Sequence, residues 1–82
     1  MKAMSNLEKY NKIFREVMQV EEEQLPTLKF RDCENWDSVG FMTLLSSIEE
    51  AFSITLEPED MMDFNSYAKG KEILSKTYGV QF

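Results

Sequence analysis

Residues 36–52 read W-D-S-V-G-F-M-T-L-L-S-S-I-E-E-A-F, the stretch that most strongly indicates how this chain folds. Asp37 is a natural N-cap, because its side chain can accept hydrogen bonds from the free N–H groups of a first helical turn. Apolar residues then recur at three- and four-residue steps, which predicts a helix over 37–52 with one wide core-facing stripe. This stripe comprises Phe41, Leu44, Leu45, Ile48, Ala51 and Phe52.

A second line of side chains follows the same predicted helix and is not needed by its core stripe. Each member lies three or four residues after the one before, so the line forms a continuous strip on the helix surface. It comprises Ser38, Met42, Ser46 and Glu49. The strip begins with a hydroxyl at the tip of a helix, and Ser38 is therefore the candidate functional residue.

A first helix and a long loop are predicted before this stretch. Ser5 and Glu8 have the spacing of a capping box, which starts a helix over about residues 6–20. No helical period continues through 21–36, and Pro26 stops any helix that reaches it, so this segment is predicted to be a loop. Three apolar residues at near-alternate spacing are expected to tie the loop to the core: Leu25, Leu28 and Phe30.

Two more helices are predicted after residues 36–52. Pro58 suits the first position of a short helix over about 58–64, and acidic residues follow in its first turn, where the dipole favours them. A last helix is predicted over about 66–78, with Gly79 as its C-terminal stop. Gly70 lies inside this helix and costs about 1 kcal/mol against alanine, which indicates a close contact between helices at that point.

The composition excludes several classes of site. The chain has 82 residues, a net charge of −6 and no histidine. Nucleic-acid binding is not expected, because phosphate contacts require clusters of Lys and Arg and the nine basic residues are scattered. A Ser-His-Asp triad is impossible without His, and no metal-ligand spacing is found, so neither a catalytic residue nor a metal site is predicted. The single cysteine, Cys33, cannot form an internal disulfide.

Length and hydrophobic content bound the architecture. A chain of this length is expected to form one domain over 1–82, and the 43% of hydrophobic residues can supply a compact core. The predicted fold class is all-α: a small, mostly antiparallel four-helix bundle with three main helices, one short helix and a long first loop. The apolar runs are too short to span a bilayer, and the first residues lack the apolar core of a secretory signal. A cytoplasmic monomer that does not bind membranes is expected.

A set of short motifs extends from Trp36 to about Leu74. It comprises Asp37-Ser38-Val39, Gly40, Phe41-Met42, Leu44-Leu45, the run from Ile48 to Ile54, and the acidic Pro58-Glu59-Asp60. Together these motifs resemble an acyl carrier protein. The W-D-S-V-G-F-M form is most similar to the stand-alone bacterial carriers whose motif begins Trp-Asp-Ser.

The resemblance implies a covalent site at Ser38. In this family a phosphopantetheinyl transferase attaches the 4′-phosphopantetheine of coenzyme A to such a serine through a phosphodiester. The thiol of this arm then carries an acyl or aminoacyl group as a thioester. A helix N-terminus suits the phosphate, because it offers free N–H groups and the positive end of the helix dipole. The resemblance therefore implies a carrier protein and not an enzyme.

The resemblance also implies a recognition face for acyl- or aminoacyl-loading and acyl-transferring enzymes with basic patches. An acidic face would speed encounters with such partners while keeping the binding weak enough for handover. The expected face comprises Asp37, Val39, Met42, Glu49 and Glu50 of the long helix and Met61 and Met62 of the short helix. For each of these two methionines, packing in the core is the alternative. Thr43 and Ser46 depart from the pattern of the fatty-acid carriers, and Lys71 stands where an apolar core residue is usual.

A second interpretation stays open beside the carrier. In it, Ser38 only caps the helix, nothing is attached to it, and the surface from Met42 to Glu50 docks a partner. The chain would then be an unmodified helical interaction module. The two interpretations differ in one observable, the covalent group on Ser38.

Overall fold

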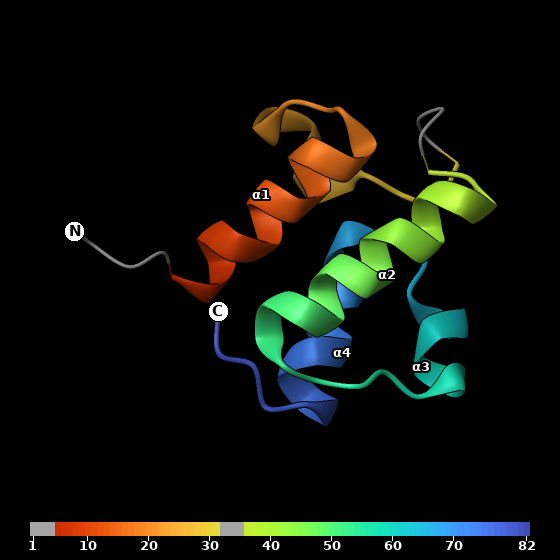
Figure 1. The fold of residues 1–82 in the computed structure, drawn as a ribbon. Helices are drawn as coiled ribbons and strands as arrows, with labels where there is room; N and C mark the ends of the chain where they lie inside the picture. Colours follow the sequence, from red (N-terminus) through yellow and green to blue (C-terminus); the bar gives the residue numbers. More distant parts are fainter. Residues whose placement is uncertain (1–4, 32–35) are drawn as a thin grey trace.

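The computed structural model describes residues 5–31 and 36–82, which form a small helical bundle (Figure 1). The helices are α1 (Asn6–Met18), α2 (Ser38–Phe52), α3 (Pro58–Asp63) and α4 (Tyr67–Thr77), with a short 3₁₀ helix, η1 (Glu22–Thr27), between α1 and α2. α1 packs on α2, η1 packs on both α1 and α4, and α3 packs on α4. The predicted fold class, an all-α four-helix bundle, is confirmed. No helix in the described ranges is long and apolar enough to cross a membrane.

The capping box predicted for α1 is present. The Glu8 N–H donates to the Ser5 hydroxyl at 3.2 Å, and the Ser5 N–H donates to the Glu8 carboxylate at 3.5 Å. α1 ends at Met18, whereas the sequence predicts an end near residue 20. The reason is local, because Gln19 adopts a left-handed conformation with φ of 55° and so ends the helical hydrogen-bond ladder.

The segment 21–36, predicted as a loop, contains the 3₁₀ helix η1, and this helix includes Pro26. The Gln24 N–H donates to the Glu21 carbonyl and the Leu28 N–H to the Leu25 carbonyl, each at 3.0 Å. These bonds close the turns on either side of Pro26, so the N–H that proline lacks is not needed for so short a helix. Both leucines are buried, as predicted. Cys33 lies outside the described residues.

An aromatic cluster fills the centre of the bundle. The ring of Phe14 in α1 lies 4.9 Å from Tyr10, 5.4 Å from Trp36 and 5.3 Å from Tyr67, measured between centroids. All four side chains are buried. Such rings contribute both apolar area and favourable edge contacts. The cluster therefore holds α1 against α4 and against the residue that precedes the cap of α2.

α4 makes its closest approach to the rest of the bundle at Gly70. A Cβ atom placed on Gly70 would lie far inside the contact distance of the Phe64 ring and of the Tyr10 hydroxyl. The hydroxyl has little freedom to move, because it donates a hydrogen bond to the Tyr67 carbonyl at 2.7 Å. The predicted reason for a glycine inside this helix, a close contact, is confirmed.

We expect the bundle to lose stability in alkaline solution partly through Tyr10. Burial raises the pKa of Tyr10 above its ordinary value of 10.0. The unfolded chain therefore loses this proton at a lower pH than the folded chain, and the free energy of unfolding falls by up to about 1.4 kcal/mol per pH unit as the pH rises past the unfolded value. Urea unfolding between about pH 8 and about pH 12 measures the slope. Tyr10→Phe is the matched control and should lose less stability per pH unit, and equal slopes would contradict the prediction.

Candidate functional site at the start of α2

Ser38 is the first residue of α2, and its side chain is exposed. Asp37 caps the helix, since its Oδ1 accepts the Gly40 N–H and its carbonyl accepts the Phe41 N–H, both at 2.8 Å. The N–H groups of Ser38 and Val39 precede these bonds and have no partner within the helix. The site therefore places an exposed hydroxyl beside two available backbone donors at the positive end of a helix dipole.

Trp36 fixes this end of α2 to the core. Its side chain has no exposed surface. Its ring lies 5.4 Å from Phe14, 6.2 Å from Phe30 and 6.4 Å from Phe41, between centroids. Its indole Nε1 has no hydrogen-bond partner among the residues that the structure describes, so its contacts with them are apolar packing. The anchoring role predicted for Trp36 is confirmed, and it holds Ser38 at a defined place on the surface.

No described residue activates the Ser38 hydroxyl. It makes no hydrogen bond to another side chain in the described ranges. The chain has no histidine to act as a general base. Among residues 5–31 and 36–82, no three His, Cys, Asp or Glu side chains gather where they could hold a metal ion. Among the described residues, Ser38 is thus an exposed hydroxyl without a side-chain partner.

Near Ser38, α2 exposes two apolar side chains. Val39 is 75% exposed and Met42 is 65% exposed. Asp37 is also exposed, with one carboxylate oxygen committed to the cap. In the view of Figure 1 this end of α2 lies at the right edge, away from the C-terminus at the left. These predicted recognition residues therefore surround Ser38 on one corner of the molecule.

The acidic part of the predicted face lies at the other end of α2, and one of its two members has a structural contact. Glu49 and Glu50 are roughly 16 Å along the helix axis from Ser38. Glu50 is exposed, but Glu49 is half-buried and its Oε2 accepts the Leu56 N–H at 2.8 Å. The Glu49 carboxylate thus holds the segment that connects α2 to α3. The sequence shows that residue 49 is acidic, but it does not show the hydrogen bond of the Glu49 carboxylate to the Leu56 N–H.

The two methionines of α3 have different surroundings. Met62 is 84% exposed, whereas Met61 is half-buried and packs against the core. Met62 therefore lies on the exposed surface of α3, and its role in partner recognition stays a prediction. Most of Met61 already serves the bundle.

The hydroxyl of Tyr78, the residue that follows α4, is hydrogen-bonded to α3 and to the residue before it. The Tyr78 hydroxyl donates to Asp60 Oδ2 at 2.7 Å and accepts the Glu57 N–H at 2.8 Å. Desolvation raises the pKa of Tyr78, and its hydrogen bond to Asp60 adds to this effect. The phenol therefore stays protonated and keeps both bonds through the neutral range. α3 is short, so this link is a substantial part of what positions it.

We expect Tyr78→Phe to loosen α3 without unfolding the bundle. The change removes two hydrogen bonds at the surface of the protein and should lower the free energy of unfolding by about 1 kcal/mol. Amide hydrogen exchange at Met61 and Met62 should become faster, while exchange in α1 should change little. Urea unfolding together with exchange measured by NMR checks both effects. Unchanged exchange in α3 would show that the link does not position it.

A groove between α1 and α2 adjoins Ser38, and the sequence analysis does not predict it. It has a volume of about 490 Å³ and is lined by Glu16 and Val17 of α1 and by Asp37, Val39, Gly40 and Thr43. The periodicity of α1 divides its residues into a core-facing stripe and a solvent-facing surface. It does not show that any of them face α2 across a groove. Which part of α1 stands beside the start of α2 depends on tertiary packing.

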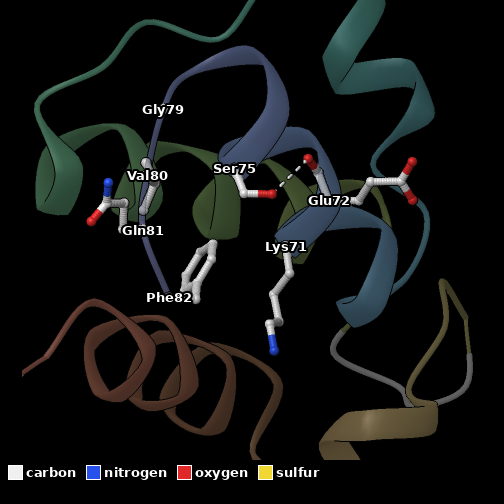
Figure 2. Close-up of a pocket in the computed structure, with 7 residues that line it drawn as sticks. All are labelled: Lys71, Glu72, Ser75, Gly79, Val80, Gln81 and Phe82. Carbon is white, nitrogen blue, oxygen red and sulfur yellow. Dashed lines mark hydrogen bonds between the residues drawn. The ribbon is translucent and has the colours of Figure 1, made fainter.

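A second hollow lies at the other end of the molecule (Figure 2). It has a volume of about 640 Å³ and is lined by Lys71, Glu72, Ser75, Gly79, Val80, Gln81 and Phe82. Phe82 packs on Phe52, the last residue of α2, so this hollow is about a helix length from Ser38. Lys71 is half-buried, with its Nζ 5.6 Å from the centre of the Tyr67 ring and 5.8 Å from that of Phe82. These cation–π contacts explain how a lysine fits where an apolar residue is usual.

The comparison with protein families gives a match that covers most of the chain. The family described as "Phosphopantetheine attachment site" matches residues 12–69, a range that contains Ser38 and all of α2 and α3. The comparison with curated proteins found no match.

Proposed function

The chain belongs to the family of phosphopantetheine attachment-site domains, and we propose that it is an acyl carrier protein whose prosthetic group is attached to Ser38. Domains of this family carry 4′-phosphopantetheine as a covalently bound group. The proposal rests mainly on one observation, the exposed and positioned hydroxyl at the start of α2. This proposal and the family membership agree on the class of function, a phosphopantetheine carrier.

The residues around Ser38 fit the chemistry of this group. The attachment needs an accessible oxygen, and the Ser38 hydroxyl is exposed and has no competing partner among the described side chains. The N–H groups of Ser38 and Val39 can donate to the oxygens of a phosphodiester, since a helix N-terminus favours an anion. The negative charge of Asp37 would repel the phosphate. This repulsion is partly offset, because Asp37 Oδ1 already accepts a hydrogen bond from the Gly40 N–H.

The reaction that loads the carrier needs a transferase. The Ser38 oxygen forms a bond to the phosphorus of coenzyme A that bears pantetheine, adenosine 3′,5′-bisphosphate leaves, and a base of the transferase takes the hydroxyl proton. This chain supplies only the positioned oxygen. When bound, the group supplies a terminal thiol that holds an acyl or aminoacyl cargo as a thioester. We therefore propose a carrier without catalytic residues of its own.

The partners would bind around both ends of α2. We propose that Val39 and Met42 supply apolar contact near the arm and that Met62 adds apolar contact from α3, because each is mostly exposed. Asp37 and Glu50 would add negative charge for the Arg and Lys patches of loading and transferring enzymes. Glu49 and Met61 would contribute less than their positions in the sequence suggest, because both also serve the bundle. We propose that the carrier acts as a cytoplasmic monomer, and its lone cysteine suits such a reducing compartment.

Incubation with coenzyme A and a broad-specificity phosphopantetheinyl transferase tests the proposal. The intact mass of the protein should increase by the mass of one 4′-phosphopantetheine. An unchanged mass with several transferases would favour the alternative, an unmodified interaction module that binds a partner through α2. The exposed Val39 and Met42 would serve that alternative as well, so the mass decides between the two.

A further inference from the structure

An aromatic ring stands between Ser38 and the interior of the bundle. Phe41 comes three residues after Ser38, so the two side chains are neighbours on the surface of α2. The Ser38 side chain is exposed, whereas the Phe41 ring is half-buried and packs against the core. An apolar group that turns inward from Ser38 along α2 therefore meets the Phe41 ring first.

Three more rings occupy the space around Phe41. Measured between centroids, its ring lies 5.7 Å from Phe30, 6.4 Å from Trp36 and 6.2 Å from Phe64. These separations are those of aromatic rings in direct contact. Trp36 comes just before the cap of α2 and Phe64 comes just after α3, and both side chains are buried. The rings thus fill the region that joins the start of α2 to the end of α3.

The Phe64 ring is itself held from two further sides. It is stacked on the Phe14 ring, with 6.3 Å between centroids and 14° between the ring planes. On the side of α4 it lies so close to Gly70 that a Cβ atom there would collide with it. Phe64 therefore has little room to move aside, and Phe41 has little room to sink deeper into the core.

This packing bears on the size of the cargo that the carrier can bury. A long acyl chain gains free energy when it leaves water, in proportion to the apolar area that becomes buried. A close-packed interior gives such a chain no space unless side chains are displaced, and extra methylene groups forced into a filled core are destabilising. A short or polar acyl group needs no burial and can stay in water at the end of the arm.

We propose that Phe41 and Phe64 close the interior beside Ser38 to a long acyl chain, so that the cargo of this carrier is a short or polar acyl group. The inference rests on the proposed attachment at Ser38. It makes Phe41 the residue that determines which cargo the bundle can bury.

Thermal unfolding of two loaded forms tests the proposal. The transferase is supplied with acetyl-coenzyme A or octanoyl-coenzyme A, so that the acyl group arrives with the arm, and intact mass verifies each product. The two wild-type forms should unfold at midpoints that agree to within about 3 °C, since neither chain is buried. A larger rise for the octanoyl form would overturn the proposal, because a buried chain stabilises the folded state. A failure to gain either mass would instead overturn the attachment at Ser38, and the cargo proposal would fall with it.

Phe41→Ala opens the space beside Ser38, and Phe52→Ala is the matched control. Phe52 is also a half-buried phenylalanine of α2, but it lies at the other end of the helix, against Phe82. In Phe41→Ala the octanoyl form should unfold more than about 3 °C above the acetyl form, whereas in Phe52→Ala the two forms should agree as in the wild type. Equal midpoints in Phe41→Ala, or a rise in both variants, would contradict the role of Phe41.

Nuclear Overhauser effects in the wild-type protein decide the proposal even if Phe41→Ala fails to fold. A uniformly ¹³C- and ¹⁵N-labelled chain carries the unlabelled octanoyl arm. Leu45 lies about two turns after Ser38 on the same side of α2, and its side chain is buried, as is that of Phe64. The terminal methyl group of the octanoyl chain should give no cross peak to Leu45 or Phe64. A cross peak to either residue would place the chain inside the bundle and overturn the proposal.

Discussion

Ser38→Ala is expected to abolish loading by the transferase completely. The variant lacks the oxygen that forms the bond to phosphorus, and no neighbouring hydroxyl of α2 occupies the first position of the helix. The fold should be retained, because Asp37 and not Ser38 caps the helix and Ser38 is exposed. The free energy of unfolding should change by no more than about 0.5 kcal/mol. Intact mass after incubation with coenzyme A, and urea unfolding, measure the two effects.

Ser46→Ala is the matched control for this experiment. Ser46 is an exposed serine of the same helix, about two turns from the start. The control should load as the wild type does. If Ser38→Ala still gains one phosphopantetheine, the attachment point is another residue, and the assignment of Ser38 is wrong even though the family is right.

Gly70→Ala should have the largest effect on stability of any single methyl group added to α4. Helix propensity alone would make alanine more stable by about 1 kcal/mol. Here the added methyl would collide with the Phe64 ring and the Tyr10 hydroxyl, both of which are buried. Overpacking of this kind costs about 1–3 kcal/mol, and displacing Tyr10 from its hydrogen bond to the Tyr67 carbonyl adds about 1 kcal/mol more. Less the gain in helix propensity, these costs give an expected net loss of about 1–3 kcal/mol in urea unfolding, a large fraction of the stability of a small domain.

Gly79→Ala separates this packing effect from the general cost of replacing a glycine. Gly79 has φ of 70°, but a Cβ there would meet no other atom within 4 Å. Its replacement should cost only the strain of a left-handed alanine, about 1 kcal/mol. A Gly70→Ala variant as stable as the wild type would show that Phe64 and Tyr10 can move aside, contrary to the packing described for α4.

Local signals in the sequence were sufficient to predict most helix ends. The capping box of α1 and the proline at the first position of α3 are both present. At the end of α4, the N–H groups of Tyr78 and Val80 both donate to the Leu74 carbonyl, around Gly79 in its left-handed conformation. These features depend on residues within one or two turns of each other, and such contacts can be read from the order of residues.

Features that depend on distant residues could not be predicted in the same way. The sequence indicates that Gly70 allows a close contact, but the partners, Tyr10 and Phe64, come from elsewhere in the chain. η1 has no hydrophobic period to reveal it, and its turns close around a proline that normally signals a break. The groove beside Ser38 is likewise formed by two helices that only the packing of the bundle brings together.

The candidate site was predictable in its chemistry and less so in its surroundings. The Asp37-Ser38 pair predicts a hydroxyl at a helix start, and the structure has Asp37 as the cap and Ser38 as the exposed first residue of α2. That Ser38 needs an external enzyme stays a prediction. The sequence does not show which acidic and apolar residues of the predicted recognition face also make contacts within the bundle. Glu49 is engaged by the Leu56 N–H, which lies beyond the end of α2.

The buried indole of Trp36 gives the protein an intrinsic fluorescence signal. It is the only tryptophan of the chain and lies two residues before Ser38, so all indole fluorescence originates beside the proposed attachment position. Phe14 and Phe41 surround it with apolar rings, an environment that keeps the emission at short wavelength until water enters. Unfolding of the bundle, and the proposed loading at Ser38 and docking at α2, should thus be detectable through this fluorescence on the unlabelled protein.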